Sequence, residues 1–358
     1  MRGKRLLSLE CIRIIACLCI LIIHFNAQVC GWSQYGRFAY SNNLVPNNYW
    51  DVYLGEIGVG LFFIVSGAGL YSGYNFKKLS VDSIFLFYKK RAYALYPYYW
   101  VAYLFASFIS FLWYKGMSMS KLRYIVTSIL GVDGYIGMLF NRYAGFYQIG
   151  EWFLGCIIVI YLLYPFFSVL LNKYPIATLI LVSVMYFSLI DKYQYHWFFF
   201  QFPYIIFGFY YMKFRETINI KLQVIMLNAL ILSRIMLNDC MHYYTKSIIL
   251  CFTLFIVMVF LYDVIEYRYK FSRIQSVTFI INELAVLTYP AFLIHHKLFL
   301  LLAPTFNLQM FPYRYTVMLF CIYIIMVLWL SVKLKKVTDN ILYRIVNKNL
   351  MLEKVEYK

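Results

Sequence analysis

Residues 7–28 read LSLECIRIIACLCILIIHFNAQ, an apolar stretch of spanning length that nevertheless carries Arg13 and His24. About 20 mostly apolar residues cross the hydrocarbon core of a bilayer as a helix. Ionisable side chains inside lipid cost on the order of 2.5–3.5 kcal/mol each, so they mark candidate functional positions. At 100° per residue, Arg13 and His24 lie within about 20° of one azimuth and roughly 16 Å apart along the axis. We therefore predict that both face one groove, Arg13 toward its inner end and His24 toward its outer end.

The rest of the chain has the composition of a membrane protein. Its 358 residues are 63% hydrophobic and 13% charged, whereas soluble domains are about 45–50% apolar and about 25% charged. A water-soluble core could not enclose this much apolar surface, so we predict an all-α, polytopic bundle of transmembrane helices. Ten segments are suitable spans, near 7–28, 53–75, 92–114, 150–171, 175–191, 196–213, 222–238, 247–265, 277–301 and 315–334.

The formal net charge of +18 does not indicate nucleic-acid binding, because Lys and Arg form short clusters between apolar runs. If the N-terminus is cytoplasmic, the loops on the inner side hold most of these residues, as the positive-inside rule requires. An even number of spans then returns the C-terminus to the cytoplasm. We predict one membrane domain over residues 1–335 and a short basic cytoplasmic tail over 336–358, which anchors at the interface.

Residues 121–140, KLRYIVTSILGVDGYIGMLF, are apolar but interrupted by three glycines and Asp133. We predict a re-entrant or interfacial helix on the outer side rather than another span. Six of the eight cysteines lie within apolar runs, and the sequence has no C-x-x-C pair. This distribution favours neither a disulfide framework nor a metal site.

Further motifs follow the first segment in order. They are Gly58-Val-Gly60-Leu-Phe-Phe-Ile-Val-Ser66-Gly67; Arg91 followed by Pro97 and Tyr98-Tyr99-Trp100; Trp152-Phe-Leu154 with Tyr161 and Pro165; and Thr288-Tyr289 with Leu293-Ile-His295. Together with Arg13-x10-His24, this series resembles the membrane acyltransferase-3 family of integral membrane O-acyltransferases, over residues 5–335. Ala94 departs from the family pattern, since a second arginine usually stands three residues after Arg91. Relatives also carry acidic residues where this chain has Ile157 and Ile158, and Glu151 is our candidate for the missing carboxylate.

The resemblance implies transfer of an acyl group, usually acetyl, from cytoplasmic acyl-CoA to a hydroxyl of a cell-surface or exported glycan. A histidine with an unperturbed pKa near 6.5 suits such proton transfer. We predict His24 as general base or transient acyl carrier, with Glu151 and His295 as further catalytic residues. His295 is expected in the same outer third as His24, whereas His296 is expected to face headgroups or a loop.

Donor binding calls for positive charge at the cytoplasmic mouth, because CoA carries several phosphates. The predicted donor-binding residues are Arg13, Arg91, Lys89 and Lys90, arginine being suited to bidentate phosphate contact. Arg13 could instead snorkel or pair with Glu10, and His24 could be an interfacial histidine. No permanently bound cofactor is predicted.

Four residues are predicted to contact substrate: Glu56, Ser66, Trp152 and Tyr289. Glu56 could alternatively cap its helix, and Ser66 could form an interhelical hydrogen bond. Gly69 and Gly73 form a G-x-x-x-G motif, which indicates close helix packing and is also compatible with a slot for the acyl arm.

Three other functions compete with this interpretation. They are a transporter or flippase for lipid-linked glycans, a glycan polymerase, and a member of the unrelated membrane acyltransferases that use a buried His with Asn. We find no inverted repeat typical of transporters, the outer loops are short for a polymerase, and Arg-x10-His opposes the third. The expected partners are acyl-CoA, a glycan acceptor and the lipid bilayer. The wealth of Lys, Ile, Asn, Tyr and Phe suggests a bacterial cytoplasmic membrane, and the sequence indicates no oligomeric state.

Overall fold

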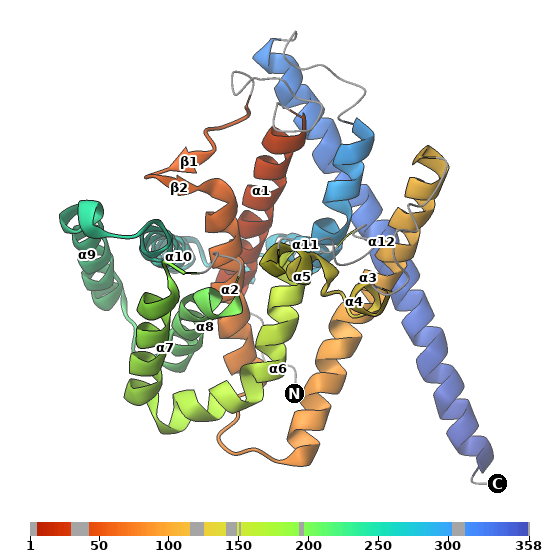
Figure 1. Ribbon diagram of the computed structural model, residues 1–358, viewed down its shortest axis with the longest axis horizontal. Coiled ribbons are helices and arrows are strands. Elements are labelled where there is room, and N and C mark those ends of the chain that lie inside the picture. Colours follow the sequence, from red (N-terminus) through yellow and green to blue (C-terminus); the bar gives the residue numbers. More distant parts are fainter. Residues whose placement is uncertain are drawn as a thin grey trace.

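The computed structural model describes residues 6–29, 43–114, 125–140, 149, 152–192, 197–302 and 312–356. These residues form twelve α-helices and one two-stranded hairpin (Figure 1). The helices are α1 (Leu7–Val29), α2 (Leu54–Gly73), α3 (Val81–Tyr114), α4 (Ile125–Ile129), α5 (Asp133–Phe140), α6 (Trp152–Lys173), α7 (Pro175–Leu189), α8 (Phe198–Lys213), α9 (Ile220–Met236), α10 (Tyr243–Tyr269), α11 (Gln275–Leu302) and α12 (Tyr313–Glu356); the strands are β1 (Asn48–Tyr49) and β2 (Val52–Tyr53). The predicted all-α class is confirmed.

Six helices in the described part of the chain are long and apolar enough to cross a membrane: α1, α2, α6, α10, α11 and α12. The chain is therefore a polytopic helical membrane protein. A helix also occupies each of the other four predicted segments, in α3, α7, α8 and α9. Of these, α7, α8 and α9 have only 15, 16 and 17 residues, so each would cross a bilayer only where it is locally thin.

Helix α2 is the packing centre, and its glycines allow other helices to approach it closely. It packs most extensively against α8 and then against α1. A Cβ atom on Gly67 would overlap the Ile205 carbonyl oxygen of α8, and one on Gly208 would overlap the Ile64 carbonyl oxygen of α2. Two glycines on facing helices thus remove the side chains that would otherwise hold the backbones apart, the usual device for helix association in lipid.

The predicted packing role of Gly69 and Gly73 is wrong. A Cβ atom at either position would meet no described atom within 4 Å, and both residues are exposed. The G-x-x-x-G spacing identifies two residues that share one face of α2, but it does not specify which helix, if any, packs against that face. The tight contact falls instead on Gly67, whose partner Gly208 is remote in sequence.

The segment 125–140 forms two short helices rather than one span. Gly131 joins α4 to α5 with φ of +72°, a left-handed conformation that favours glycine. Aromatic side chains of α3 satisfy the carbonyls exposed by the break: Tyr99 Oη donates to Ser128 at 2.6 Å and Trp100 Nε1 donates to Ile129 at 2.8 Å. Figure 1 places α4 and α5 near α3 and α6. Irregular backbone buried in a membrane protein requires such protein partners, and the break falls at Gly131, one of the glycines that interrupt the apolar segment. The re-entrant or interfacial helix on the outer side stays a prediction.

Helix α12 continues without a break through the predicted tail. Its residues run helically from Tyr313 to Glu356, and its C-terminal part projects beyond the other helices (Figure 1). Asp339 accepts hydrogen bonds from Tyr98 Oη at 2.6 Å and from Lys335 Nζ at 2.8 Å. This polar contact fastens the start of the projecting part to α3.

We predict opposite effects of one added methyl group at two glycines. Gly208→Ala places carbon against the Ile64 backbone and should destabilise the protein by about 1–3 kcal/mol or more through overpacking. Gly69→Ala is the matched control, since its Cβ enters open space and alanine favours the helix. Melting temperatures in detergent should fall for the first variant and stay level or rise for the second. An unchanged melting temperature for Gly208→Ala would contradict the α2–α8 contact.

Candidate active site

Three histidines from two helices meet near the C-terminal end of α1. His24 of α1 lies against His295 and His296 of α11, with ring centroids 5.0 Å and 4.4 Å away. The two α11 rings are 4.7 Å apart. Nδ1 of His24 and Nε2 of His296 are separated by 2.9 Å, a hydrogen-bond distance. The predicted proximity of His24 and His295 is confirmed, and the prediction that His296 faces headgroups or a loop is wrong.

His296 was misplaced because neighbouring residues on a helix diverge by about 100°. His24 lies between the directions of His295 and His296, so both rings reach it. His295 is fully buried, whereas His24 and His296 are partly exposed. Substrate can therefore approach the latter two rings more readily than His295.

Helix α11 fixes the ring of His295. Its Nδ1 lies 2.6 Å from the carbonyl oxygen of Phe292. Because a carbonyl oxygen only accepts, Nδ1 carries the proton of the neutral ring and Nε2 carries the lone pair. His295 is held in one tautomer by the helix to which it belongs.

Residues between Arg13 and His24 confirm that this side of α1 faces α11. Cys17 is buried, and its Sγ points at the Thr288 carbonyl oxygen of α11 at 3.8 Å. Arg13 lies near the other end of α1, where its Nη1 contacts Glu10 Oε2 at 2.5 Å. The ion pair is the alternative role that the sequence left open for Arg13, and the Arg13 side chain remains 29% exposed.

Arg91 lies in an aromatic cage. Its guanidinium carbon is 5.0 Å from the ring centre of Tyr74 and 5.6 Å from that of Tyr161. The Arg91 Nε atom is buried without a hydrogen-bond partner among the described residues. Two aromatic faces therefore stabilise this cation while part of its donor capacity remains unused.

The other cations of the predicted donor site differ from Arg91 in environment. Lys90 Nζ lies 5.7 Å from the Tyr74 ring centre, so it shares one wall of the cage. Lys89 and Lys90 are exposed. Ala94 is exposed as well. The position where a second arginine would stand is therefore on the surface of α3 and not in the protein core.

An aromatic chain connects the predicted substrate residue Trp152 to the histidines. The ring centroids are 6.4 Å apart for Trp152 and Phe153, 5.4 Å apart for Phe153 and Phe292, and 5.8 Å apart for Phe292 and His295. Tyr289 precedes His295 by six residues on α11, about 1.7 helical turns, and donates to the Leu95 carbonyl at 3.2 Å. Both residues border the region between α3, α6 and α11.

The structure does not bring the other predicted residues to the histidines. Glu56 faces Tyr243 and Ser247 of α10, and its buried Oε2 has no hydrogen-bond partner among the described residues. Ser66 is half-buried on the α2 face that also carries Gly69. Glu151 lies outside the described residues.

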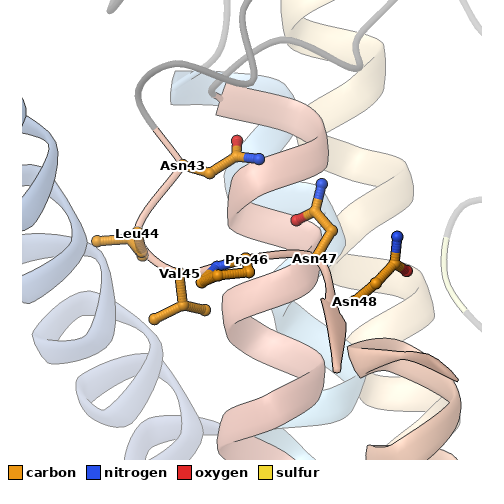
Figure 2. A pocket seen from close by; sticks show the side chains of 6 residues that line it. All are labelled: Asn43, Leu44, Val45, Pro46, Asn47 and Asn48. Atoms are coloured by element: carbon orange, nitrogen blue, oxygen red, sulfur yellow. The ribbon is translucent and has the colours of Figure 1, made fainter. Parts of the chain in front are cut away.

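An asparagine-rich loop follows α1 and leads to the hairpin. Residues 43–48 line an open hollow of about 520 Å³ (Figure 2). Buried Asn26 holds this loop: its Nδ2 donates to Val45 O at 3.1 Å and Asn47 Oδ1 at 3.0 Å, and its Oδ1 accepts from Leu44 N at 3.0 Å. Asn26 was not predicted from the sequence, although a polar residue closing an apolar run two positions after His24 could have drawn attention to it.

Arg234 of α9 braces the hairpin turn that follows. Trp50 and Asp51 have φ of 47° and 61°, which is unfavourable for residues with a side chain. Buried Arg234 donates to the Trp50 carbonyl at 2.7 Å and lies 3.7 Å from the Asp51 carboxylate. The turn thus accepts one hydrogen bond from this buried cation and places a carboxylate near it, while Arg234 Nε has no hydrogen-bond partner among the described residues. Trp50 in this turn is 58% exposed.

The three histidines are also the described residues that could hold a metal ion. One nitrogen of each lies within 4.8 Å of the others. Three imidazoles and an open fourth position are typical of catalytic zinc sites. The sequence predicted no metal site, because its cysteines lie mostly within apolar runs and form no C-x-x-C pair.

A comparison with protein-family models finds one described as "Acyltransferase domain", of the acyltransferase 3 type, over residues 6–335. The searches of curated proteins and of solved structures return no match. The family match spans both the histidine cluster and the Arg91 cage.

We predict that Asn26 orders the asparagine-rich loop. Asn26→Leu keeps a similar shape but leaves the Leu44 amide and Val45 carbonyl without their partner, and each unsatisfied group costs about 1–3 kcal/mol. Hydrogen exchange of a peptide covering residues 43–54 should accelerate by about tenfold or more. The control Asn228→Leu, which removes an exposed amide bonded within its own helix, should leave this rate unchanged. Equal exchange in both variants would rule out Asn26 as the loop's support.

Proposed function

This chain belongs to the acyltransferase 3 family and is an acyltransferase, and we propose that it acylates a glycan hydroxyl outside a bacterial cytoplasmic membrane. The donor in this proposal is cytoplasmic acyl-CoA, with acetyl as the acyl group. The observation that carries it is the arrangement along α1: His24 meets two further histidines at one end, and Arg13 lies about 16 Å away toward the other. A proton-transfer centre and a cationic end thus share one face.

The proposed topology has ten spans and both termini in the cytoplasm. In that orientation α1 runs outward, so the histidine cluster and the asparagine-rich loop lie on the outer side. Arg91, Lys89 and Lys90 lie near the cytoplasmic start of α3. The distribution of Lys and Arg between loops supports this orientation.

On the cytoplasmic side, we assign the phosphates of acyl-CoA to Arg91 with Lys89, Lys90 and Arg13. Arg91 is the best supported of the four, because its cage orients the guanidinium while leaving Nε without a partner among the described residues. Arginine binds phosphate through a planar fork of donors. Arg13 contributes positive potential, although its pairing with Glu10 reduces what it offers a phosphate.

The open face of α2 supports a path for the acyl arm from these cations to the histidines. A Cβ atom added to Gly69 or Gly73 would have no described atom within 4 Å, and Ser66 lies on the same face at helical spacing. A thin pantetheine arm fits along glycines where a bulkier helix surface would exclude it. Ser66 supplies one hydroxyl along this path.

At the outer end, we assign His24 as the general base. It removes the proton from the acceptor hydroxyl while the hydroxyl oxygen attacks the thioester carbonyl. His295 is less suited because it is fully buried, and we assign it a positioning role beside His24. Trp152, Tyr289 and the asparagine-rich loop would contact the acceptor, and aromatic faces and amides are suited to sugar rings and hydroxyls.

Two predicted carboxylates, Glu56 and Glu151, remain to be assigned. Glu56 faces Tyr243 and Ser247, so it contributes to the contact between α2 and α10 near the outer end. Glu151 stays a candidate catalytic carboxylate from the sequence alone. Family membership favours acyl transfer over the transporter, flippase and polymerase alternatives.

We predict that binding and chemistry separate between Arg91 and His24. Arg91→Glu should weaken acetyl-CoA binding by about tenfold or more, because it replaces a charge-assisted contact with repulsion. His24→Ala should leave that affinity within about threefold and reduce acylation by about 100-fold or more. Isothermal titration and transfer of radiolabelled acetyl to host membranes measure the two quantities. Equal losses of binding in both variants would contradict the division of roles.

The reaction itself is tested in the host. Mass analysis of the surface glycan should show loss of an acyl mass when the gene is deleted and its return with the wild-type chain but not with His24→Ala. An unchanged acyl content with altered glycan amount or length would contradict the proposal and favour transport or polymerisation.

A further inference from the structure

The histidine cluster contains one contact that the proposed reaction has not used, between His24 and His296. His24 Nδ1 and His296 Nε2 lie 2.9 Å apart, and the rings meet edge-on at 89°. Two nitrogens at this separation need a proton between them, because two lone pairs would repel. One ring donates and the other accepts.

The role of His24 decides the direction of this hydrogen bond. A neutral imidazole carries one proton, so a His24 that accepts a proton at Nε2 must carry its own proton at Nδ1. Nδ1 of His24 is then the donor, and Nε2 of His296 is the acceptor. The opposite tautomer of His24 would block Nε2 with a hydrogen and could not act as a base through that atom.

We propose that His296 is the positioning residue of His24: it accepts the Nδ1–H proton, holds His24 in the tautomer with a lone pair on Nε2, and stabilises the imidazolium formed during transfer. This inference rests on the proposed function. A neutral histidine here takes the place that a carboxylate takes in serine-type triads, where the partner orients the imidazole without taking its proton.

The reaction balances without any net change at His296. The proton of the acceptor hydroxyl moves to His24 Nε2, and the hydroxyl oxygen forms a bond to the thioester carbonyl carbon. The carbon–sulfur bond then breaks, and the CoA thiolate takes the proton from His24 Nε2. The products are the acyl ester and CoA thiol, and throughout these steps the Nδ1–H of His24 stays hydrogen-bonded to His296.

A metal ion at the cluster is the competing interpretation. Two imidazole nitrogens bound at about 2.0–2.1 Å to a tetrahedral ion lie about 3.3 Å apart. The separation of 2.9 Å between His24 and His296 is shorter than this and matches a hydrogen bond. The geometry therefore favours the proton between these rings over a metal.

Two substitutions of nearly equal polarity separate positioning from packing. His296→Gln can place its amide oxygen where Nε2 lies, so it can accept the proton of His24. His296→Asn is one methylene shorter and cannot reach that point. His242→Asn is the control for loss of a histidine elsewhere, since His242 caps α10 through its side chain and asparagine is also a good cap.

The assay follows transfer of acetyl from radiolabelled acetyl-CoA to the glycan of host membranes, together with KM for acetyl-CoA. We expect His296→Asn to lower kcat by about 100-fold or more with KM within about threefold of wild type. His296→Gln should recover at least about tenfold of that loss, and His242→Asn should match wild type. Melting temperatures confirm that the variants fold, and metal analysis of the purified wild type completes the experiment.

Three outcomes would overturn the inference. They are an active His296→Asn variant, equal losses in the Gln and Asn variants with folding intact, or about one transition-metal ion per wild-type chain whose removal abolishes activity. Failure of the proposed function looks different, because wild type itself would then transfer no acetyl to glycan.

Discussion

The structure depends on one constraint: inside a bilayer, a polar group without a partner in the protein costs several kcal/mol, because lipid offers none. The chain meets it locally where it can, by helices, and by long-range contacts where the helices break. Carbonyls exposed between α4 and α5 are bonded by Tyr99 and Trp100 of α3. Buried Arg234 donates to the Trp50 carbonyl of the hairpin turn and lies near the Asp51 carboxylate. These contacts fix where irregular backbone can lie, and hence where a polar site can open.

The sequence predicted the helices well because their signal is local. Apolar runs, glycine interruptions and charge clusters specify spanning segments without reference to partners. The packing between helices depends on what lies opposite, which local patterns do not encode. Gly69 and Gly73 matched a packing motif yet face open space, whereas Gly67 lies against the Ile205 backbone and Gly208 against the Ile64 backbone so closely that neither tolerates a side chain.

The candidate site, too, combines residues that local sequence patterns predicted with residues that they did not. His24 and Arg13 were predicted from helical periodicity alone, and the contact of Cys17 with Thr288 shows that their face meets α11. His296 was missed because an azimuth on an isolated helix treats one direction as the site. Because His24 of α1 lies between the directions of His295 and His296, both of these α11 side chains reach it. Asn26 was missed for a related reason, since its importance lies in the loop residues that it binds.

The residue types at the two ends of α1 follow from the free-energy cost of burying a charge in a medium of low dielectric constant. Arg13, near the end of α1 opposite His24, has a carboxylate partner in Glu10, and Arg91 of α3 has two aromatic faces, so both cations are stabilised. At the histidine end, a buried carboxylate would orient His24 strongly, but its desolvation costs several kcal/mol unless it is paired. A neutral imidazole accepts the same hydrogen bond with no charge to desolvate. His295, held by the Phe292 carbonyl, adds a third neutral ring in a fixed orientation. In the mechanism proposed above, a cluster of histidines thus supplies an oriented base without a permanent charge inside a membrane protein.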